Sequence, residues 1–477
     1  MSPVFDETKY RALLEKLEIS VLTYSEICKN NNTYRWDSEY FLKAYLAADV
    51  LIRNRKVVQL NSVASIKGGK RLPLFATFSQ QGSPYVRAED VKNGFIHWEE
   101  SPKISFEIYQ SIKQYQLKYN DLLLTIVGNS IGDVGICKFD ISPCNFTENC
   151  VKITNNNVSE YLFSFLLSHY GQIQIAREQV GTAQPKLAIE RIRTFLIPQF
   201  DQQFYNAIKT VIDDARKKEE ASIDCYKKSE NGLLADLNLT DWQPDDESVA
   251  TKTFADFQNS GRLDAEYYQP KYQAIAEKLT QYSNGTVSCA NVLVNAMTKL
   301  TADTEYCYLE LADIGKSGEI NSCTQDVAEN LPSRARQKVK TNDVIVSTVE
   351  GSLASCALIT EEFNNAICST GFHVLRSAEI NPETLLLLMK SSPVQALLKQ
   401  GCSGTILTAI LPDALKAIKL PLIRKEVQNE LAAKVQESFA LRKESKRLLD
   451  LAKHAVEVAI EQGEDAAIKL LERCKDA

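Results

Sequence analysis

The feature that most constrains this chain is an internal repeat: short motifs from its first half return in the same order in its second half. The offset between the two copies is nearly the same for every pair of motifs, which chance agreement does not explain. We infer a tandem duplication of a unit of roughly 220 residues. The paired blocks are residues 35–41 with 262–268, 85–96 with 308–320, 118–125 with 340–347, 181–182 with 404–405, and Pro198 with Pro421.

Each copy predicts the same mixture of strands and helices. The apolar, β-branched runs 122–127 and 344–349 follow an Asn-Asp pair and precede glycine-containing turns, a pattern typical of strands. Helical segments are predicted around residues 160–168 and 383–391, and each copy closes with a strand end at a proline. The expected fold class is therefore α+β, with two tandem mixed α/β domains related by pseudo-twofold symmetry.

A long polar helix is predicted after each closing proline. The first carries an apolar stripe at Phe204, Ile208, Val211 and Ala215, and the second carries stripes over residues 427–435 and 448–458. Narrow stripes surrounded by charges predict two antiparallel helices in a coiled coil that separates the domains. Packing of each stripe on its own domain stays open as the alternative. If exposed, these stripes would make the chain depend on partners for solubility.

The repeat predicts the domain boundaries. Leu13-Leu14 resembles Leu233-Leu234, so the N-terminal segment resembles the end of a connector that begins at the C-terminus, a circular arrangement. The predicted parts are 1–34, an N-terminal connector; 35–198, the first domain; 199–240, a central spacer helix; 241–261, a linker; 262–421, the second domain; and 422–477, a C-terminal spacer helix.

Composition excludes several classes of protein. The 55 basic and 61 acidic residues give a net charge of −6, and the 44% of hydrophobic residues are ordinary for a globular protein. Residues 35–198 nevertheless hold 19 basic and 15 acidic side chains, and the acidity lies mainly in the connector. No apolar run is long enough for a membrane span, and we expect a cytoplasmic protein. Twelve scattered cysteines predict reduced thiols, and four distant histidines predict no metal site.

No motif for catalysis survives inspection. The run 67–71 fails as a phosphate-binding loop because Ala64 and Arg71 stand where glycine and Ser or Thr are required. No methyltransferase, hydrolase-elbow, metalloprotease or nuclease motif occurs, which predicts a chain that is not an enzyme. Asp37 and Glu39, repeated as Asp264 and Glu266, are interpreted as anchors of a helix start.

Basic and polar side chains on predicted loops are the candidates for nucleic-acid contact. Lysine and arginine neutralise phosphates, and glycines in the run 67–71 permit close approach, although a solvated turn is the alternative there. The run 334–340 alternates basic residues, which lie on one face if the segment is extended. The candidates are Lys67, Lys70, Arg71, Arg87, Asn129, Ser130, Gln184 and Lys186 in the first domain, and Arg334, Arg336, Lys338, Ser352 and Thr405 in the second.

The repeated blocks, with a long helix after each, resemble the specificity (S) subunit of bacterial type I restriction-modification systems. The resemblance rests on residues 262–272, 67–71, 120–125, 181–186 with 404–408, and the helix ending 233–242. It implies two target recognition domains that each read one half of a split DNA sequence, and two spacer helices that hold the domains apart and bind two methyltransferase (M) subunits. The R subunits would attach through the M subunits.

The resemblance also implies that this chain binds no cofactor itself. S-adenosylmethionine would be bound by the M subunit, and ATP and Mg²⁺ by the R subunit. Since the loops of the two copies differ, with Gln184-Pro185-Lys186 standing against residues 407–409, we expect an asymmetric target in double-stranded DNA. The open alternatives are the specificity subunit of a type IIB-like enzyme and, outside nucleic-acid binding, a protein scaffold.

Overall fold

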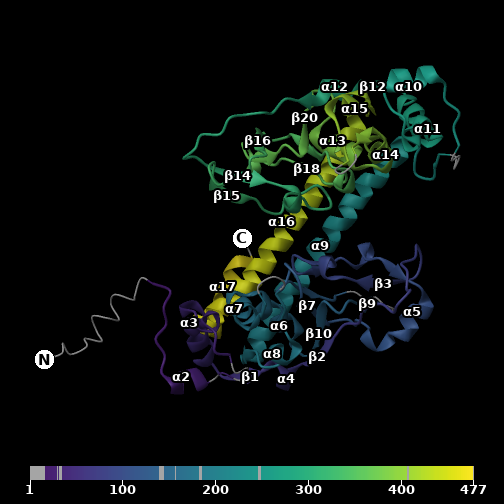
Figure 1. The fold of residues 1–477 in the computed structure, drawn as a ribbon. Helices are drawn as coiled ribbons and strands as arrows, with labels where there is room; N and C mark the ends of the chain where they lie inside the picture. The colour runs from purple at the N-terminus through teal and green to yellow at the C-terminus, as the bar shows by residue number, and fades with distance from the viewer. Residues whose placement is uncertain are drawn as a thin grey trace. The chain divides into compact units, whose positions relative to one another are not determined.

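A computed structural model describes residues 17–29, 31, 35–138, 144–155, 157–181, 185–244, 249–404 and 408–475. The chain divides into two compact units: unit 1 contains residues 1–218 and 443–477, and unit 2 contains residues 219–442 (Figure 1). None of the described helices is both long and apolar enough to cross a membrane.

Unit 1 is a mixed α/β unit. Its strands are β1 (Val57–Gln59), β2 (Ser65–Gly68), β3 (Ser83–Val86), β4 (Val91–Lys92), β5 (Phe95–Ile96), β6 (Lys103–Ile104), β7 (Leu122–Thr125), β8 (Val134–Ile136), β9 (Asn145–Phe146), β10 (Cys150–Thr154) and β11 (Leu196–Pro198). Its helices are α2 (Tyr24–Cys28), η1 (Ser38–Phe41), α3 (Lys43–Arg53), α4 (Leu60–Val63), η2 (Ala88–Asp90), η3 (Trp98–Glu100), α5 (Phe106–Ser111), η4 (Lys113–Tyr115), α6 (Ser159–Leu167), α7 (His169–Glu178), α8 (Ile189–Ile192) and α17 (Glu464–Lys475).

Unit 2 contains a closely similar set of elements. Its strands are β12 (Thr286–Ser288), β13 (Leu293–Val294), β14 (Glu305–Leu309), β15 (Thr324–Val327), β16 (Ala335–Lys338), β17 (Val344–Ser347), β18 (Cys356–Leu358), β19 (Ile367–Ser369), β20 (Phe372–Leu375), β21 (Cys402–Ser403), β22 (Ala409–Ile410) and β23 (Lys419–Pro421). Its helices are α10 (Phe254–Ser260), η5 (Ala265–Tyr268), α11 (Pro270–Thr280), α12 (Cys289–Val292), η6 (Leu311–Asp313), η7 (Glu350–Ser352), η8 (Glu361–Phe363), α13 (Pro382–Lys390), α14 (Ser392–Gly401) and α15 (Pro412–Ala417).

The central sheets of the two units have matching strand orders. The order is β2-β10-β7-β8 in unit 1 and β13-β20-β17-β18 in unit 2, and every neighbouring pair is antiparallel. A two-stranded pair closes each unit, β1 with β11 and β12 with β23. The predicted duplication and the predicted strands, helices and proline-terminated strand ends are therefore confirmed.

An Asn-Asp turn starts the central strand of each sheet. Asn120 and Asn342 adopt φ values of 66° and 72°, a left-handed conformation that asparagine tolerates better than most residues. The next residue, Asp121 or Asp343, accepts a hydrogen bond from the backbone N–H three residues before it, at 2.7 and 2.8 Å. The repeated Asn-Asp pair thus forms the turn that leads into β7 and β17, at the start of each strand.

Two long helices, α9 (Gln202–Asp236) and α16 (Lys425–Gln462), contribute one half to each unit. Within unit 2, Ser438 Oγ donates to the Ser222 carbonyl at 2.8 Å, and within unit 1, Ser445 Oγ donates to the Ala215 carbonyl at 2.7 Å. The partners run in opposite directions along the two helices, so the helices pack antiparallel in each unit.

The apolar stripes of these helices are buried inside the chain. Phe204, Ile208, Val211 and Ala215 belong to one core with the sheet residues of unit 1, and Leu431 and Val435 belong to the core of unit 2. The stripes therefore pack on their own units as well as helix on helix. The expectation that these stripes are exposed is wrong, because the sheets and helices of each unit cover them, and dependence of the chain on partners for solubility stays a prediction.

The division into compact units falls inside the long helices, whereas the boundaries predicted from the sequence lie at their ends. Those boundaries, the pseudo-twofold relation and the circular connector stay predictions. Leu13 and Leu14, on which the connector was inferred, lie outside the described residues.

The prediction of reduced cysteines is wrong for one pair. Cys307 of β14 and Cys323 form a disulfide with a Cα–Cα distance of 5.6 Å, because β14 and β15 pair antiparallel and bring the two positions together. The other ten cysteines form no disulfide, and seven of them are buried. Spacing in the sequence did not indicate this pairing, because no short cysteine motif joins the two positions.

Candidate nucleic-acid interface

Most of the unit 1 candidates meet at one edge of the central sheet. Strands β2 and β7 both end at this edge, where the antiparallel β10 begins, since Gly68 pairs with Val151 and Thr125 with Cys150. The segment after β2 carries Lys70 and Arg71, and the turn between β7 and β8 carries Asn129 and Ser130. Positions that are distant in the sequence are thereby brought to the same side of the sheet.

A hairpin brings Lys186 to this edge as well. The backbone of Lys186 pairs with Val180 through hydrogen bonds of 3.0 and 2.9 Å and also bridges Val127. Leu187 N–H donates to the Ile126 carbonyl at 3.0 Å, which fixes the hairpin beside the end of β7. Gln184, a further candidate, lies outside the described residues.

The lysines of this edge are available for an anionic partner. Lys67, Lys70 and Lys186 are exposed, and none of them is ion-paired with any residue in the described ranges. Arg71 is exposed and forms an ion pair with Glu148 at 2.5 Å. Burial alone would raise the pKa of Glu148, but the hydrogen bonds from Arg71, Thr147 and the backbone, together with the charge of Arg71, hold that pKa below its ordinary value.

The predicted loop 67–71 differs from expectation at its start. Lys67 and Gly68 lie in strand β2, with the Lys67 side chain exposed on the strand surface. A Cβ at Gly69 would meet the Thr147 carbonyl oxygen at 1.9 Å. Gly69 is thus required by packing against the neighbouring backbone, which gives a structural reason for a glycine interpreted from sequence as a phosphate contact.

The remaining unit 1 candidates differ in exposure and in the partners that their polar groups already have. Asn129 is exposed, whereas Ser130 is half-buried and its carbonyl accepts from Asp133 N–H at 3.0 Å, closing the turn. Burial raises the pKa of Asp133, against the opposing charge of Lys92. Arg87 contacts Glu89 and pairs with Asp90 at 3.3 Å, where it caps η2. A contact of Arg87 with DNA stays a prediction, and its guanidinium already has two acidic partners.

Unit 2 builds a corresponding edge. Strand β17 ends where β20 begins, and the turn that follows carries Ser352, whose hydroxyl lies 2.9 Å from that of Ser347. The hairpin β21–β22 lies beside this turn through the bridge of Val349 with Ala409. Thr405, a further candidate, lies outside the described residues.

The basic run of unit 2 is extended, as its alternation predicted. Arg334 precedes β16, and Arg336 and Lys338 lie in it; all three are exposed, while Ala335 and Gln337 between them are buried. The Arg334 carbonyl accepts from Thr370 N–H at 2.9 Å. The carbonyl of the next residue, Gly371, accepts from the N–H of Thr348, directly after β17. The start of the run, at Arg334, therefore borders the same edge as Ser352.

A repeated glutamine braces the turn in each unit. Gln172 of α7 donates to the Gly132 carbonyl at 2.9 Å, and Gln395 of α14 donates to the Leu353 carbonyl at 3.1 Å. Each also donates to a carbonyl at the end of the preceding helix. Neither glutamine was predicted from the sequence as a site residue. Their separation matches the offset of the repeat, which was the signal that could have found them.

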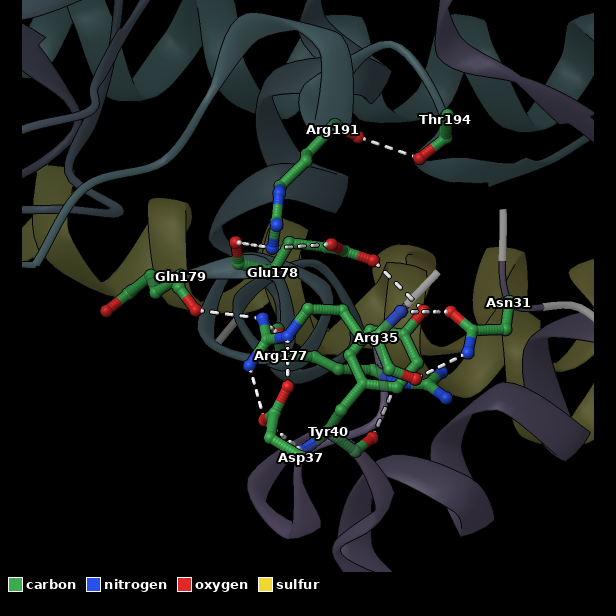
Figure 2. Close-up of polar contacts among 9 residues, drawn as sticks. All are labelled: Asn31, Arg35, Asp37, Tyr40, Arg177, Glu178, Gln179, Arg191 and Thr194. Atoms are coloured by element: carbon green, nitrogen blue, oxygen red, sulfur yellow. Dashed lines mark hydrogen bonds and ion pairs between the residues drawn. The ribbon is translucent and has the colours of Figure 1, made fainter. Parts of the chain in front are cut away.

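The Arg-x-Asp motif of unit 1 holds the start of the hairpin (Figure 2). Arg35 donates to the carbonyls of Arg177 and Gln179 at 3.2 and 3.0 Å, and its guanidinium also pairs with Asp37. This hydrogen bond lowers the pKa of Asp37, against the opposing effect of its partial burial. Arg35 thereby fixes the end of α7, from which the hairpin continues.

Figure 2 also shows Tyr40 and Glu178 within this cluster. Tyr40 Oη donates to Glu178 at 3.1 Å, and Arg177 Nε donates to the Tyr40 carbonyl at 2.9 Å while its guanidinium lies over the Tyr40 ring. Arg191 donates to the Glu178 carbonyl at 3.1 Å. Asp37 accepts from Tyr40 N–H at 3.2 Å at the start of η1, which confirms its interpretation as a helix-start anchor.

The corresponding motif of unit 2 is held differently. Arg262 pairs with Asp264 at 2.6 Å and lies over the Tyr267 ring, and Gln400 donates to the Tyr267 carbonyl at 2.9 Å. The hairpin of unit 2 has a further support in His373, whose Nε2 lies 3.1 Å from the Ile410 carbonyl. Burial lowers the pKa of His373, so this side chain acts as a neutral hydrogen-bonding group.

The described residues contain no group of three or more His, Cys, Asp or Glu side chains placed to hold a metal ion. The candidate edges present lysine, arginine, hydroxyl and amide groups, which bind phosphate and base edges. Their chemistry is that of recognition.

Comparisons with known proteins find a match in the first half of the chain. Residues 53–221 match the family model described as "Type I restriction modification DNA specificity domain". The Type I restriction enzyme MjaVIII specificity subunit of Methanocaldococcus jannaschii is 23% identical over 192 residues, which cover 38% of this chain and 45% of the relative. The chain thus matches less than half the length of that curated relative.

Two solved structures align with most of the chain at low similarity. The S subunit of a type I restriction-modification system from M. genitalium is 13% identical with a TM-score of 0.37, covering 88% of this chain and 96% of that one. The HsdS subunit from Thermoanaerobacter tengcongensis is 16% identical with a TM-score of 0.27, covering 86% and 97%. Over residues 53–221 the chain is thus similar to type I restriction-modification DNA specificity domains.

Proposed function

We propose that this chain reads DNA sequence for a type I restriction-modification complex, with each unit reading one half of a bipartite, asymmetric target. The observation that carries the proposal is the convergence, in both units, of hairpin, turn and basic side chains on the same edge of the central sheet. Polar side chains on short turns can reach base edges in the major groove, while lysines and arginines around them bind phosphates.

The two edges carry different side chains, which supports an asymmetric target. Unit 1 offers Lys70, Arg71 and Lys186, whereas unit 2 offers the exposed run from Arg334 to Lys338 along β16. Different donors select different bases, since each base pair shows its own pattern of donors and acceptors in the major groove. We therefore infer two unlike half-sites.

The helices α9 and α16 are proposed to act as the spacer and as the docking site for two M subunits, through which R subunits attach. Their lengths of 35 and 38 residues correspond to about 52 and 57 Å at 1.5 Å per residue. One turn of DNA repeats every 34–36 Å or so, within that reach. S-adenosylmethionine would be bound by the M subunit, and ATP with Mg²⁺ by the R subunit.

Selection of binding sites tests the proposal. The full-length chain, co-purified with the M subunit encoded beside it, is incubated with randomised duplex DNA, and the bound fraction is sequenced. We expect two short, unlike sequence blocks separated by a constant number of unspecified base pairs. A single contiguous block, a palindrome or no enrichment would contradict a bipartite, asymmetric target.

A set of matched lysine variants locates the interface. Lys70→Ala and Lys186→Ala each remove an unpaired cation from the candidate edge, so the slope of log K against log salt should decrease by about 0.9 for each phosphate that is no longer neutralised. Lys118→Ala is the control, because Lys118 is exposed at the opposite edge of the same sheet, before β7. An equal effect of Lys118→Ala would place the DNA elsewhere.

A further inference from the structure

The loop between β2 and β3 presents two apolar side chains to solvent. Leu74 and Phe75 are 89% and 99% exposed, more than any other large hydrophobic residue in the described ranges. Both limbs of the loop are anchored: Leu72 packs against a small core that includes Tyr85, and the Phe78 ring lies 6.4 Å from that of Tyr85. The tip is therefore held out on a fixed base.

The backbone of the tip keeps Phe75 in this position. Ala76 N–H donates to the Pro73 carbonyl at 3.0 Å, which closes a four-residue turn with Phe75 at its third position. Phe75 has a φ of 70°, in the left-handed region where such a turn ordinarily takes glycine or asparagine. A bulky aromatic residue there is an outlier that packing inside the described part of the chain does not explain.

The charge around the tip identifies the chemistry of its partner. No acidic residue occurs in the sequence between Asp49 and Glu89, while this stretch holds seven lysines and arginines, of which three, Arg53, Arg71 and Arg87, pair with acidic residues outside it. Lys67 and Lys70 at the base of the loop are ion-paired with none of the described residues. An exposed apolar tip in a basic, acid-free segment fits a polyanion with an apolar interior, and stacked nucleic-acid bases have that character.

The base of the loop lies at the candidate edge. Lys70 N–H donates to the Phe146 carbonyl at 3.1 Å, and Gly69 N–H donates to the Cys150 carbonyl at 3.1 Å, at the start of β10. The corresponding segment of unit 2, residues 295–304, is shorter, includes Asp303, and exposes only Met297 to 55% among its large hydrophobic residues. The feature is therefore specific to unit 1.

We propose that the Leu74–Phe75 tip inserts between stacked bases of the duplex half-site that unit 1 reads. This inference rests on the proposed function and adds a contact that basic residues alone do not supply. Apolar wedges partly unstack a base step and kink the duplex, and an aromatic ring can stack on the base it exposes. An inserted ring would also support the duplex beside a base extruded for modification.

Three variants at Phe75 test the wedge, using the full chain with its M subunit and the duplex obtained by site selection. Phe75→Ala and Phe75→Asn remove the ring, and asparagine retains the left-handed turn; each should weaken binding by about fivefold or more. Phe75→Trp should keep the affinity and show quenched tryptophan fluorescence in the complex, measured as the difference from wild type.

Phe254 provides the matched control, because it is 75% exposed in α10 of unit 2. Phe254→Ala should leave the affinity unchanged, and the added fluorescence of Phe254→Trp should be unaffected by DNA. Unchanged affinity of Phe75→Ala together with unquenched Trp at position 75 would overturn the wedge. Loss of the M subunit on purification of Phe75→Ala would also overturn it, as the tip would then be a protein contact. If wild type selects no sequence, the proposed function itself fails, which is a separate result.

Discussion

Arg35→Ala should loosen the unit 1 hairpin without unfolding the unit. Its guanidinium is largely buried, with 11% of the side chain exposed, and donates to two backbone carbonyls at the end of α7. A hydrogen bond from a charged donor contributes about 1.5–3 kcal/mol. The pair with Asp37, which is 44% exposed, adds little. Because water replaces part of the missing hydrogen bonding, we expect about 2 kcal/mol, or roughly a thirtyfold increase in local opening.

Hydrogen exchange measures this opening directly. The backbone N–H groups of Val180, Lys186 and Leu187 are hydrogen-bonded within the hairpin or to β7, so their exchange should accelerate by roughly thirtyfold in Arg35→Ala. Arg35→Lys should give an intermediate effect, since an ammonium cannot reproduce the planar set of donors. Protection of β7 and β10 should not change.

Arg262→Ala is the matched control in unit 2. Among the described contacts, the Arg262 guanidinium pairs with Asp264 and lies over the Tyr267 ring, and no backbone carbonyl is bound by it. Exchange in the β21–β22 hairpin should therefore change much less. Unaltered exchange at Val180 and Lys186 in Arg35→Ala, with the variant folded, would refute the argument that this cluster holds the hairpin.

The remaining predictions concern the turn between β7 and β8, the loss of stability at acid pH, the contact between α9 and α16, and the disulfide. Gln172→Leu removes the side-chain donor to the Gly132 carbonyl and should weaken DNA binding by the selected-site assay while thermal unfolding changes by only about 1 kcal/mol. Burial would raise the pKa of Glu160, but its hydrogen bonds and ion pairs, chiefly those with Lys138 and Lys209, keep that pKa below its ordinary value of 4.5. Its ionised form therefore contributes stability at neutral pH that is lost on acidification below about pH 4.5, and Glu160→Gln should be less stable at pH 7 and show a flatter acid limb in urea unfolding. Ser438→Leu overpacks the fully buried contact between α9 and α16 and should cost about 1–3 kcal/mol, whereas Ala440→Leu on the exposed side of α16 should cost almost nothing, as calorimetry would show. Thiol titration of the denatured, unreduced protein should find ten reactive cysteines, and finding twelve would contradict the Cys307–Cys323 disulfide.

The sequence by itself determined the repeated architecture. Constant spacing of short motifs indicated two copies, and β-branched runs after Asn-Asp pairs located β7 and β17. Alternation of charge along residues 334–338 predicted the exposed face of β16. These features are local, because strand periodicity and left-handed asparagine turns depend on neighbouring residues. The apolar stripes of the two long helices were also evident from the sequence. The sequence did not show that these stripes pack against the sheets.

The tertiary structure decided which side chains act together. Antiparallel pairing of β2 and β7 with β10 brings the ends of β2 and β7 to one edge of the sheet. Lys70, Asn129 and Lys186 therefore lie at the same edge although they are distant in the sequence. Pairing of β14 with β15 likewise produced the disulfide at Cys307. The role of Arg35 could not be read locally, since its partners are carbonyls far along the chain, at Arg177 and Gln179. Every residue has a backbone carbonyl, so the sequence does not indicate which carbonyl a side chain binds. Only the folded chain shows it.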